Sequence, residues 1–225
     1  MQTIGVLGGM TWHSSIEYYR AINTLANERL GGAHSARCVL FSVDAGPVEE
    51  LMLAERWEEA GALLSSDAAA VEAAGADVFV LACNSLHHVW DTVVAPLTIP
   101  SIHIGDAAAD ALAGHASVLL LGTRFTMELP WLRSRIESRG IEVLVPRDTD
   151  RAEINRTIFE EMSRGVFSTA TRAWYVDLIS RFDADALVIA CSEIGMLVRP
   201  EDVTLPVVDT MAAHAAAVVD YAYDA

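Results

Sequence analysis

The chain contains no lysine, and all 15 of its basic residues are arginine. Lysine-linked pyridoxal phosphate is therefore excluded, because that cofactor is held as a Schiff base on a lysine amine. Cysteine is scarce, with three residues in 225, which argues against a disulfide framework and favours a reducing, cytoplasmic setting. The formal net charge is −16. No nucleic-acid partner is expected, because phosphate binding needs a basic face.

Long hydrophobic runs and nucleotide-binding motifs are also missing. No apolar stretch reaches about 18 residues without a charge, so no membrane span is expected. The first residues, MQTIGVLGGM, lack a basic leader region and are typical of a first strand. The spacing of GVLGGM is not GxGxxG, and neither a P-loop nor a GxSxG motif occurs. His87 and His88 are adjacent and would point apart on a helix, so no metal site is predicted.

What the sequence does contain is an alternation of short apolar runs with helical stretches. The apolar runs are continuous and β-branched, which is typical of parallel strands buried on both faces. They lie at 3–8, 36–43, 77–83, 100–104, 117–122, 141–146, 186–191 and 206–209, and the helical stretches lie at 14–30, 48–75, 107–114, 126–140 and 150–182. This alternation predicts an α/β fold with parallel sheets.

The two halves of the chain resemble each other. Three landmarks recur in the same order at nearly one offset: a strand closed by Gly8 or Gly122, a strand followed by Cys83 or Cys191, and a T-x-P triplet ending at Pro100 or Pro206. We therefore expect two similar parallel-sheet lobes related by a pseudo-twofold axis, with the active site in the cleft between them. The lobes are predicted at 1–95 plus 205–225 and at 96–204. The alternative is that α/β chains are self-similar without any functional repeat.

Two of the three cysteines stand at the carboxyl ends of equivalent strands, where parallel sheets bind ligands. Inverting a carbon next to a carboxylate needs a base on one face and an acid on the other, and a thiolate and a thiol can fill these roles if the pKa of one thiol is lowered. The turn N–H groups, with Asn84, Ser85 and Ser192, can hold a substrate carboxylate without net positive charge. The alternative is an inert core thiol, the role expected for Cys38.

The motifs around these residues resemble the aspartate/glutamate racemase superfamily over essentially the whole chain. The resemblance is carried by IGVLGGMTW at 4–12, LACNSLHH at 81–88 and VIACSEIGMLV at 188–198, with further similarity at 121–127 and 150–167. It implies a cofactor-independent racemase of aspartate, glutamate or a related α-amino acid, similar to the broad-specificity and Asp/Glu-specific bacterial enzymes. It also implies a homodimer.

Carried over by position, the resemblance makes Cys83 and Cys191 the acid/base residues. Substrate binding is implied for Met10, for Asn84, Ser85 and Ser192 at the α-carboxylate, and for Thr123 and Thr126. Arg164 falls where some members carry a lysine that meets the side-chain carboxylate, the alternative being a surface cation at a helix end. Serine replaces the family's usual threonine after both cysteines. The stretch where aspartate-specific relatives carry an arginine is apolar in this sequence, because it contains Leu51 and Met52.

Other functions and roles stay open at this point. Superfamily relatives with one working thiol decarboxylate a malonate and others isomerise maleate, so a cysteine-dependent decarboxylase or cis–trans isomerase of a small dicarboxylic acid is one alternative. A non-catalytic small-molecule binder is another. His87 is expected either to orient the Cys83 region or to be a capping or solvated residue. His13 is expected to be a surface residue at a helix N-terminus, and for His214 a structural role and a functional one are equally open.

Overall fold

The computed structural model describes residues 2–224, which form two compact units. Unit 1 comprises 2–104 with 214–224, and unit 2 comprises 105–213. The chain passes from unit 1 to unit 2 after Ile104 and returns to unit 1 at His214. Both of these chain crossings lie further along the sequence than the predicted ones at 95/96 and 204/205. The first lies later because Pro100 and Ile102 hydrogen-bond to Phe79 of unit 1. The predicted pseudo-twofold relation between the units stays a prediction.

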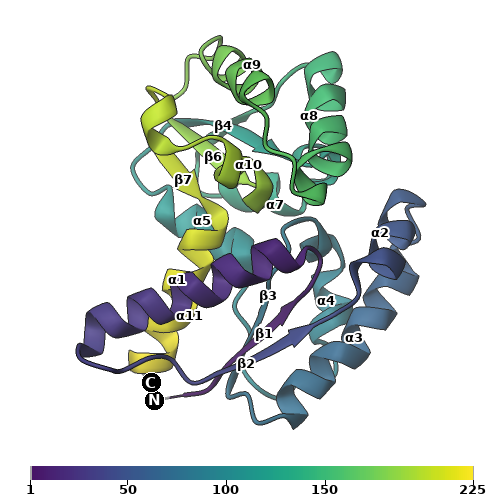
Figure 1. Ribbon diagram of the computed structural model, residues 1–225, viewed down its shortest axis with the longest axis vertical. Coiled ribbons are helices and arrows are strands. Elements are labelled where there is room, and N and C mark those ends of the chain that lie inside the picture. Colours follow the sequence, from purple (N-terminus) through teal and green to yellow (C-terminus); the bar gives the residue numbers. More distant parts are fainter. Residues whose placement is uncertain (1, 225) are drawn as a thin grey trace. The chain divides into compact units, whose positions relative to one another are not determined.

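Unit 1 is built on a parallel sheet of three strands in the order β2-β1-β3. Helices α1 and α11 lie on one side of this sheet and α3 and α4 on the other (Figure 1). Strands β1 and β3 are buried along their whole length because apolar side chains face helices on both sides. The elements are β1 (Ile4–Gly8), α1 (Trp12–Leu30), β2 (Cys38–Ser42), α2 (Ala45–Leu53), α3 (Trp57–Ala73), β3 (Val78–Leu81), the 3₁₀ helix η1 (Ser85–Val89), α4 (Trp90–Val94) and α11 (Thr210–Asp224), whose first turn belongs to unit 2.

Unit 2 is built on a parallel sheet of four strands in the order β5-β4-β6-β7. Side chains of β4 and β6 pack with those of α8, α9 and α10 in a core that includes Cys191. The elements are α5 (Ile104–Ala111), β4 (Ser117–Gly122), α6 (Arg124–Glu128), α7 (Pro130–Glu137), β5 (Glu142–Leu144), α8 (Asp148–Glu160), η2 (Met162–Arg164), α9 (Thr169–Ile179), β6 (Ala186–Ala190), α10 (Ser192–Leu197), η3 (Pro200–Asp202) and β7 (Val207–Asp209). The predicted α/β class with two similar parallel sheets is confirmed.

The internal repeat extends to individual hydrogen bonds. In unit 1 the carbonyl of Pro100 accepts from the N–H of Phe79 on β3 at 2.9 Å, and in unit 2 the carbonyl of Pro206 accepts from the N–H of Leu187 on β6 at 2.8 Å. The T-x-P triplets therefore place equivalent segments beside equivalent strands.

Two aspartates occupy equivalent positions in the two halves of the repeat and make equivalent hydrogen bonds. Asp77, just before β3, accepts the N–H of Thr3 through its side chain at 2.7 Å. Asp185, just before β6, likewise accepts the N–H groups of Ala116 and Ser117, at 2.8 and 2.9 Å. These carboxylates satisfy N–H groups at the start of the central strand, and the bonds from Ala116 and Ser117 lower the pKa of Asp185.

The structure corrects four of the predicted elements. The helix predicted over 126–140 is broken between α6 and α7, where Leu129 adopts an extended backbone before Pro130. Residues 100–104 form only an isolated bridge at Ser101 before α5 begins. The helix predicted over 48–75 is broken between α2 and α3, where Glu55 adopts a positive φ of 55°. The helix predicted over 150–182 is broken after η2, where Gly165 adopts φ 79°. Among residues 2–224 no helix is long and apolar enough to span a membrane.

Candidate active site

In unit 1, Cys83 follows β3 and stands beside the turn that closes β1. The N–H of Ala82 donates to the carbonyl of Leu7 at 2.8 Å, so β1 and β3 end together. Their adjacency brings the turn that carries Met10 next to the Cys83 turn. Met10, Cys83 and Asn84 are half-buried, and Ser85 is buried where η1 begins.

The turn between β1 and α1 is rigid for identifiable reasons. Gly9 has φ 100°, and a Cβ at this position would lie 2.3 Å from the carbonyl oxygen of Val43, so only glycine fits. The Gly9 N–H donates to the Ser15 hydroxyl at 2.7 Å. Thr11 caps α1 by accepting the N–H of Ser14. Met10 is therefore held in a fixed backbone position.

His87 packs against the Cys83 turn, and both nitrogens of its ring form hydrogen bonds. Its Nδ1 is 2.8 Å from the carbonyl oxygen of Cys83, and its Nε2 accepts the N–H of Ile104 at 3.2 Å. Because Nε2 is the acceptor, the proton of the neutral ring is on Nδ1, which donates to Cys83. His87 therefore hydrogen-bonds to the Cys83 region, and it is buried, not solvated.

Three buried aromatic side chains surround His87. Its ring stacks on Trp90 with centroids 4.9 Å apart and meets the rings of His103 and His214 edge-on at 4.6 and 5.8 Å. Burial lowers the pKa of His87 well below its usual range, and His103 and His214 lower it further. Among the described residues no group of three or more His, Cys, Asp or Glu side chains is arranged to hold a metal ion.

His214 takes the opposite tautomer. Its Nε2 is 2.8 Å from the carbonyl oxygen of Ile102, which can only accept, so Nε2 carries the proton and Nδ1 accepts from the Tyr18 hydroxyl at 3.0 Å. Burial lowers the pKa of His214 to about 4.

Long-range ¹H–¹⁵N NMR of histidine-labelled protein is therefore expected to show an Nδ1–H ring for His87 and an Nε2–H ring for His214, both neutral at pH 5.5. Charged rings at that pH, or the reverse tautomers, would contradict this network.

In unit 2, Cys191 follows β6 directly and is the N-cap residue of α10. Its thiol donates to Oε2 of Glu193 at 3.1 Å, and the hydroxyl of Ser192 donates to the same oxygen at 3.0 Å. Cys191 and Glu193 are both only 7% exposed. The thiol and the carboxylate therefore form a buried pair at the carboxyl edge of the sheet.

Burial holds the pKa of the Cys191 thiol well above its usual range, and the Glu193 carboxylate raises it further by its charge and by its hydrogen bond. The N–H groups of Glu193 and Ile194 act in the opposite direction and have the smaller effect. The lowered thiol pKa that a strand-to-helix turn can produce is therefore not found at Cys191. Cys191 is a protonated thiol at neutral pH.

The turn after β4 lies next to Cys191 because Gly122 pairs with Ala190 in the sheet. Thr123 caps α6 by accepting the N–H of Thr126, and the two hydroxyl oxygens are 3.3 Å apart. Thr123 is 7% exposed and Thr126 is fully buried. Thr126 is therefore placed to hold Thr123 and the turn.

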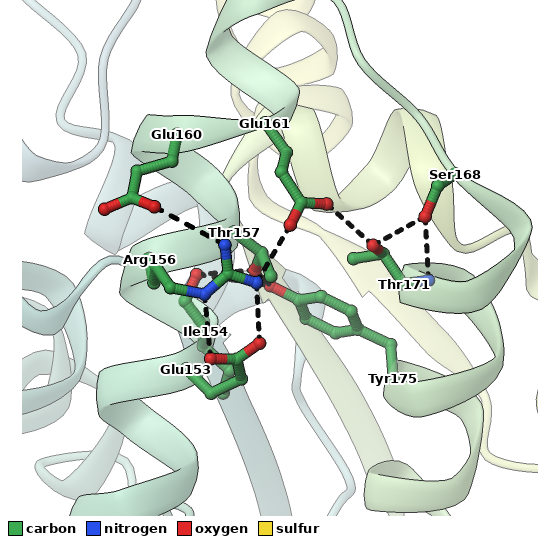
Figure 2. Close-up of polar contacts among 9 residues, drawn as sticks. All are labelled: Glu153, Ile154, Arg156, Thr157, Glu160, Glu161, Ser168, Thr171 and Tyr175. Atoms are coloured by element: carbon green, nitrogen blue, oxygen red, sulfur yellow. Dashed lines mark hydrogen bonds and ion pairs between the residues drawn. The ribbon is translucent and has the colours of Figure 1, made fainter.

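Arg164 is exposed on η2, which packs against α10. The segment that carries it is anchored by a polar network (Figure 2). Arg156 donates to Glu161 at 2.9 Å, Glu161 accepts from the Thr171 hydroxyl at 2.7 Å, and Thr171 is 2.7 Å from the Ser168 hydroxyl. These contacts join the two ends of the segment between α8 and α9, and Arg164 lies between those ends in the sequence.

The family model for Asp/Glu/hydantoin racemases matches residues 7–218. The chain belongs to the Asp/Glu/hydantoin racemase family. It is therefore an isomerase of the racemase class, as the sequence motifs predict.

Solved structures support this membership. A candidate Asp/Glu racemase from Yersinia pestis is 41% identical, with 99% of each chain covered and a TM-score of 0.88. An aspartate racemase homologue from Pyrococcus horikoshii OT3 is 30% identical, again with 99% of each chain covered and a TM-score of 0.84. A glutamate racemase from Thermus thermophilus, in complex with β-chloro-D-alanine, is 18% identical and shares the fold, with a TM-score of 0.60 over 98% of this chain and 80% of that one.

The racemase thus gathers its predicted site residues into two groups. Met10, Asn84 and Ser85 lie on the turns beside Cys83 in unit 1, and Thr123, Thr126 and Ser192 lie on the turns beside Cys191 in unit 2. Arg164 is exposed on η2, which packs against α10. Met52 is buried in α2, Leu51 is half-buried there, and His13 is half-buried in α1.

Sequence reasoning missed Glu193, whose role depends on contact with the thiol. A carboxylate two residues after a strand-end cysteine was the available signal. It also missed the packing of His103 and His214 around His87, for which the sequence offers no local signal.

Proposed function

We propose that this racemase inverts the α-carbon of aspartate, glutamate or a related α-amino acid without a cofactor, using Cys83 and Cys191 as its two acid/base residues. The observation that supports it is the placement of both cysteines at the carboxyl end of the equivalent strand, β3 and β6, in the two units. The absence of lysine supports the cofactor-free route. The homodimer and the cytoplasmic location stay predictions.

In the proposed reaction one sulfur removes the α-proton from one face and the other sulfur donates a proton to the opposite face. Cys191 is the resting acid, because burial and Glu193 keep its proton in place. Cys83, which is half-buried, is the resting base. In the reverse direction Cys191 must be the base, and the Glu193 carboxylate that accepts its hydrogen bond is the group that can take its proton.

Binding of the substrate is assigned to polar groups around the two sulfurs. The α-carboxylate is held by Asn84, Ser85 and Ser192 with help from Thr123, and Ser192 exchanges its bond to Glu193 for one to the substrate. Met10 contacts the substrate from the β1–α1 turn. Hydrogen bonds from fixed neutral donors suit an anion in a protein of net charge −16.

The proposal is tested by proton NMR in deuterated water without added cofactor, on a panel of L- and D-amino acids that includes aspartate and glutamate. The α-proton signal of the substrate should disappear starting from either enantiomer. Exchange from one enantiomer only would leave a single working thiol. No exchange across the panel would contradict the proposal and favour a malonate, a maleate or another non-amino-acid ligand.

Arg164 is proposed to meet the side-chain carboxylate of the substrate. Arg164→Gln should raise KM for aspartate and glutamate about 10- to 100-fold, the range expected for loss of a hydrogen bond to a charged group, while kcat changes less. Steady-state kinetics by polarimetry measures both constants. Arg199→Gln, which removes an exposed arginine before η3, is the matched control. Unchanged KM in Arg164→Gln would make Arg164 a surface cation.

A further inference from the structure

The proposed proton transfer uses the sulfur of Cys83 but leaves the buried imidazole beneath it without a role. His87 is 2% exposed, and its Nδ1–H donates to the carbonyl of Cys83 itself at 2.8 Å. The N–H of His87 also donates to the carbonyl of Asn84 at 3.0 Å. The turn that presents the Cys83 sulfur is thus held by the side chain and the backbone of one residue.

The other ring nitrogen of His87 is bonded to a part of the chain remote in sequence. Ile104, whose N–H donates to Nε2 at 3.2 Å, is the last residue of unit 1 before the chain passes to unit 2. His214 is the first residue after the chain returns. Its Nε2 donates to Ile102, two residues before Ile104, and its ring contacts His87 edge-on. The neutral imidazoles of His87 and His214 therefore connect the Cys83 turn to the residues at both chain crossings.

We propose that His87 is a positioning residue for proton transfer at Cys83, tying the Cys83 turn to the first chain crossing through its neutral Nδ1–H ring. This inference rests on the proposed two-cysteine function. The Nδ1–H bond fixes the carbonyl of Cys83 and hence the direction of its side chain. Because a displacement of about 1 Å at a reacting group can cost about 10²-fold in rate, the effect should appear in catalysis at Cys83 and not at Cys191.

Two substitutions separate the bonds of His87. The amide nitrogen of asparagine can take the place of Nδ1–H, so His87→Asn can still donate to Cys83 while it loses the acceptor for Ile104. The amide of glutamine reaches the place of Nε2, so His87→Gln can still accept from Ile104 while it loses the donor to Cys83. His87→Gln should therefore be the more damaging. His88→Gln is the matched control, because the adjacent His88 ring instead packs against Trp57.

The assay is elimination from the enantiomers of β-chloroalanine, which requires proton removal from one face only. One thiolate takes the α-proton, the electrons of that C–H bond form the new double bond, and chloride leaves the β-carbon with its bonding pair. Water converts the resulting 2-aminoacrylate to pyruvate and ammonia, and pyruvate is measured. The enantiomer whose elimination is lost in Cys83→Ser, but kept in Cys191→Ser, defines the Cys83 face.

On the Cys83 face, His87→Gln should slow elimination about 10- to 100-fold, and His87→Asn and His88→Gln should be less affected. Elimination on the Cys191 face should keep its wild-type rate, which also shows that the variant is folded. Equal losses on both faces, or no loss in His87→Gln, would overturn the positioning role and leave His87 as a core residue. If Cys83→Ser eliminates from both enantiomers as the wild type does, the two-cysteine function fails instead.

A second measurement does not depend on substrate choice. The rate of iodoacetamide alkylation at each cysteine is followed by peptide mass spectrometry between pH 6 and 10. In His87→Gln the pH midpoint for Cys83 should shift, while the profiles of Cys38 and Cys191 should match those of the wild type and His88→Gln. An unshifted Cys83 midpoint overturns the proposal even where β-chloroalanine is not turned over.

Discussion

Replacing either strand-end cysteine is expected to reduce racemisation by about 10²- to 10⁴-fold, the usual range for loss of a general acid or base. Cys83→Ser and Cys191→Ser each keep a side chain of similar shape but remove the group that can be both base and acid near neutral pH. Circular dichroism of product formation from L- and D-substrate measures the loss in both directions. Because the equilibrium constant of a racemisation is one, kcat/KM must fall equally in the two directions.

The third cysteine supplies the control for this experiment. Cys38 lies on β2, and burial raises the pKa of its thiol to about 11, so it is not a base near neutral pH. Cys38→Ser should racemise at close to the wild-type rate. A Cys191→Ser or Cys83→Ser variant that racemises as fast as Cys38→Ser would exclude the two-base mechanism. Loss in Cys83→Ser alone would favour one-thiol chemistry, and a disubstituted malonate with detection of carbon dioxide would then test for a decarboxylase.

Glu193→Gln is expected to have the second largest effect, a fall of about 10²-fold in kcat/KM for racemisation. The substitution removes the carboxylate that accepts the hydrogen bond of the Cys191 thiol, with Sγ and Oε2 3.1 Å apart, but keeps the size of the side chain. Cys191 then lacks the carboxylate to which it can pass its proton when it has to act as the base. Polarimetry on the wild type and the variant, from both enantiomers, measures the loss.

The same substitution is expected to lower the pKa of the Cys191 thiol, although it slows catalysis. The negative charge and the hydrogen bond of Glu193 raise the pKa of Cys191 in the wild type, so their removal should lower it. Burial, the largest cause, is unchanged, so the pKa should stay above its usual range. Alkylation of Cys191 by iodoacetamide should therefore begin at lower pH in Glu193→Gln than in the wild type, although the enzyme is slower.

Glu201→Gln, at an exposed position on η3, is the matched control and should change neither kcat/KM nor the alkylation profile. Wild-type catalysis in Glu193→Gln would make Glu193 a structural partner of the thiol only. An alkylation profile that stays in place or moves to higher pH would contradict the coupling between the carboxylate and Cys191.

Much of the fold could be predicted from the sequence because its signals are local and repeated. Continuous β-branched runs such as Val78–Leu81 and Ala186–Ala190 have one favourable environment, a parallel strand covered on both faces. Two T-x-P triplets and two strand-end cysteines at nearly one offset then predict two similar parallel-sheet units. The errors lie where one residue changes the chain direction, as at Glu55 and Gly165, or where a backbone segment pairs too briefly to form a strand, as at Ser101.

The sequence by itself determined the family, the α/β class and the positions of Cys83 and Cys191 at strand ends, because these depend on residue type and spacing along one strand. Only the tertiary structure decided the electrostatics of the site. Glu193 raises the pKa of Cys191 because both are buried within hydrogen-bonding distance, and burial strengthens charge interactions. The tautomers of His87 and His214 likewise depend on carbonyl and N–H partners that the fold brings to them from other elements.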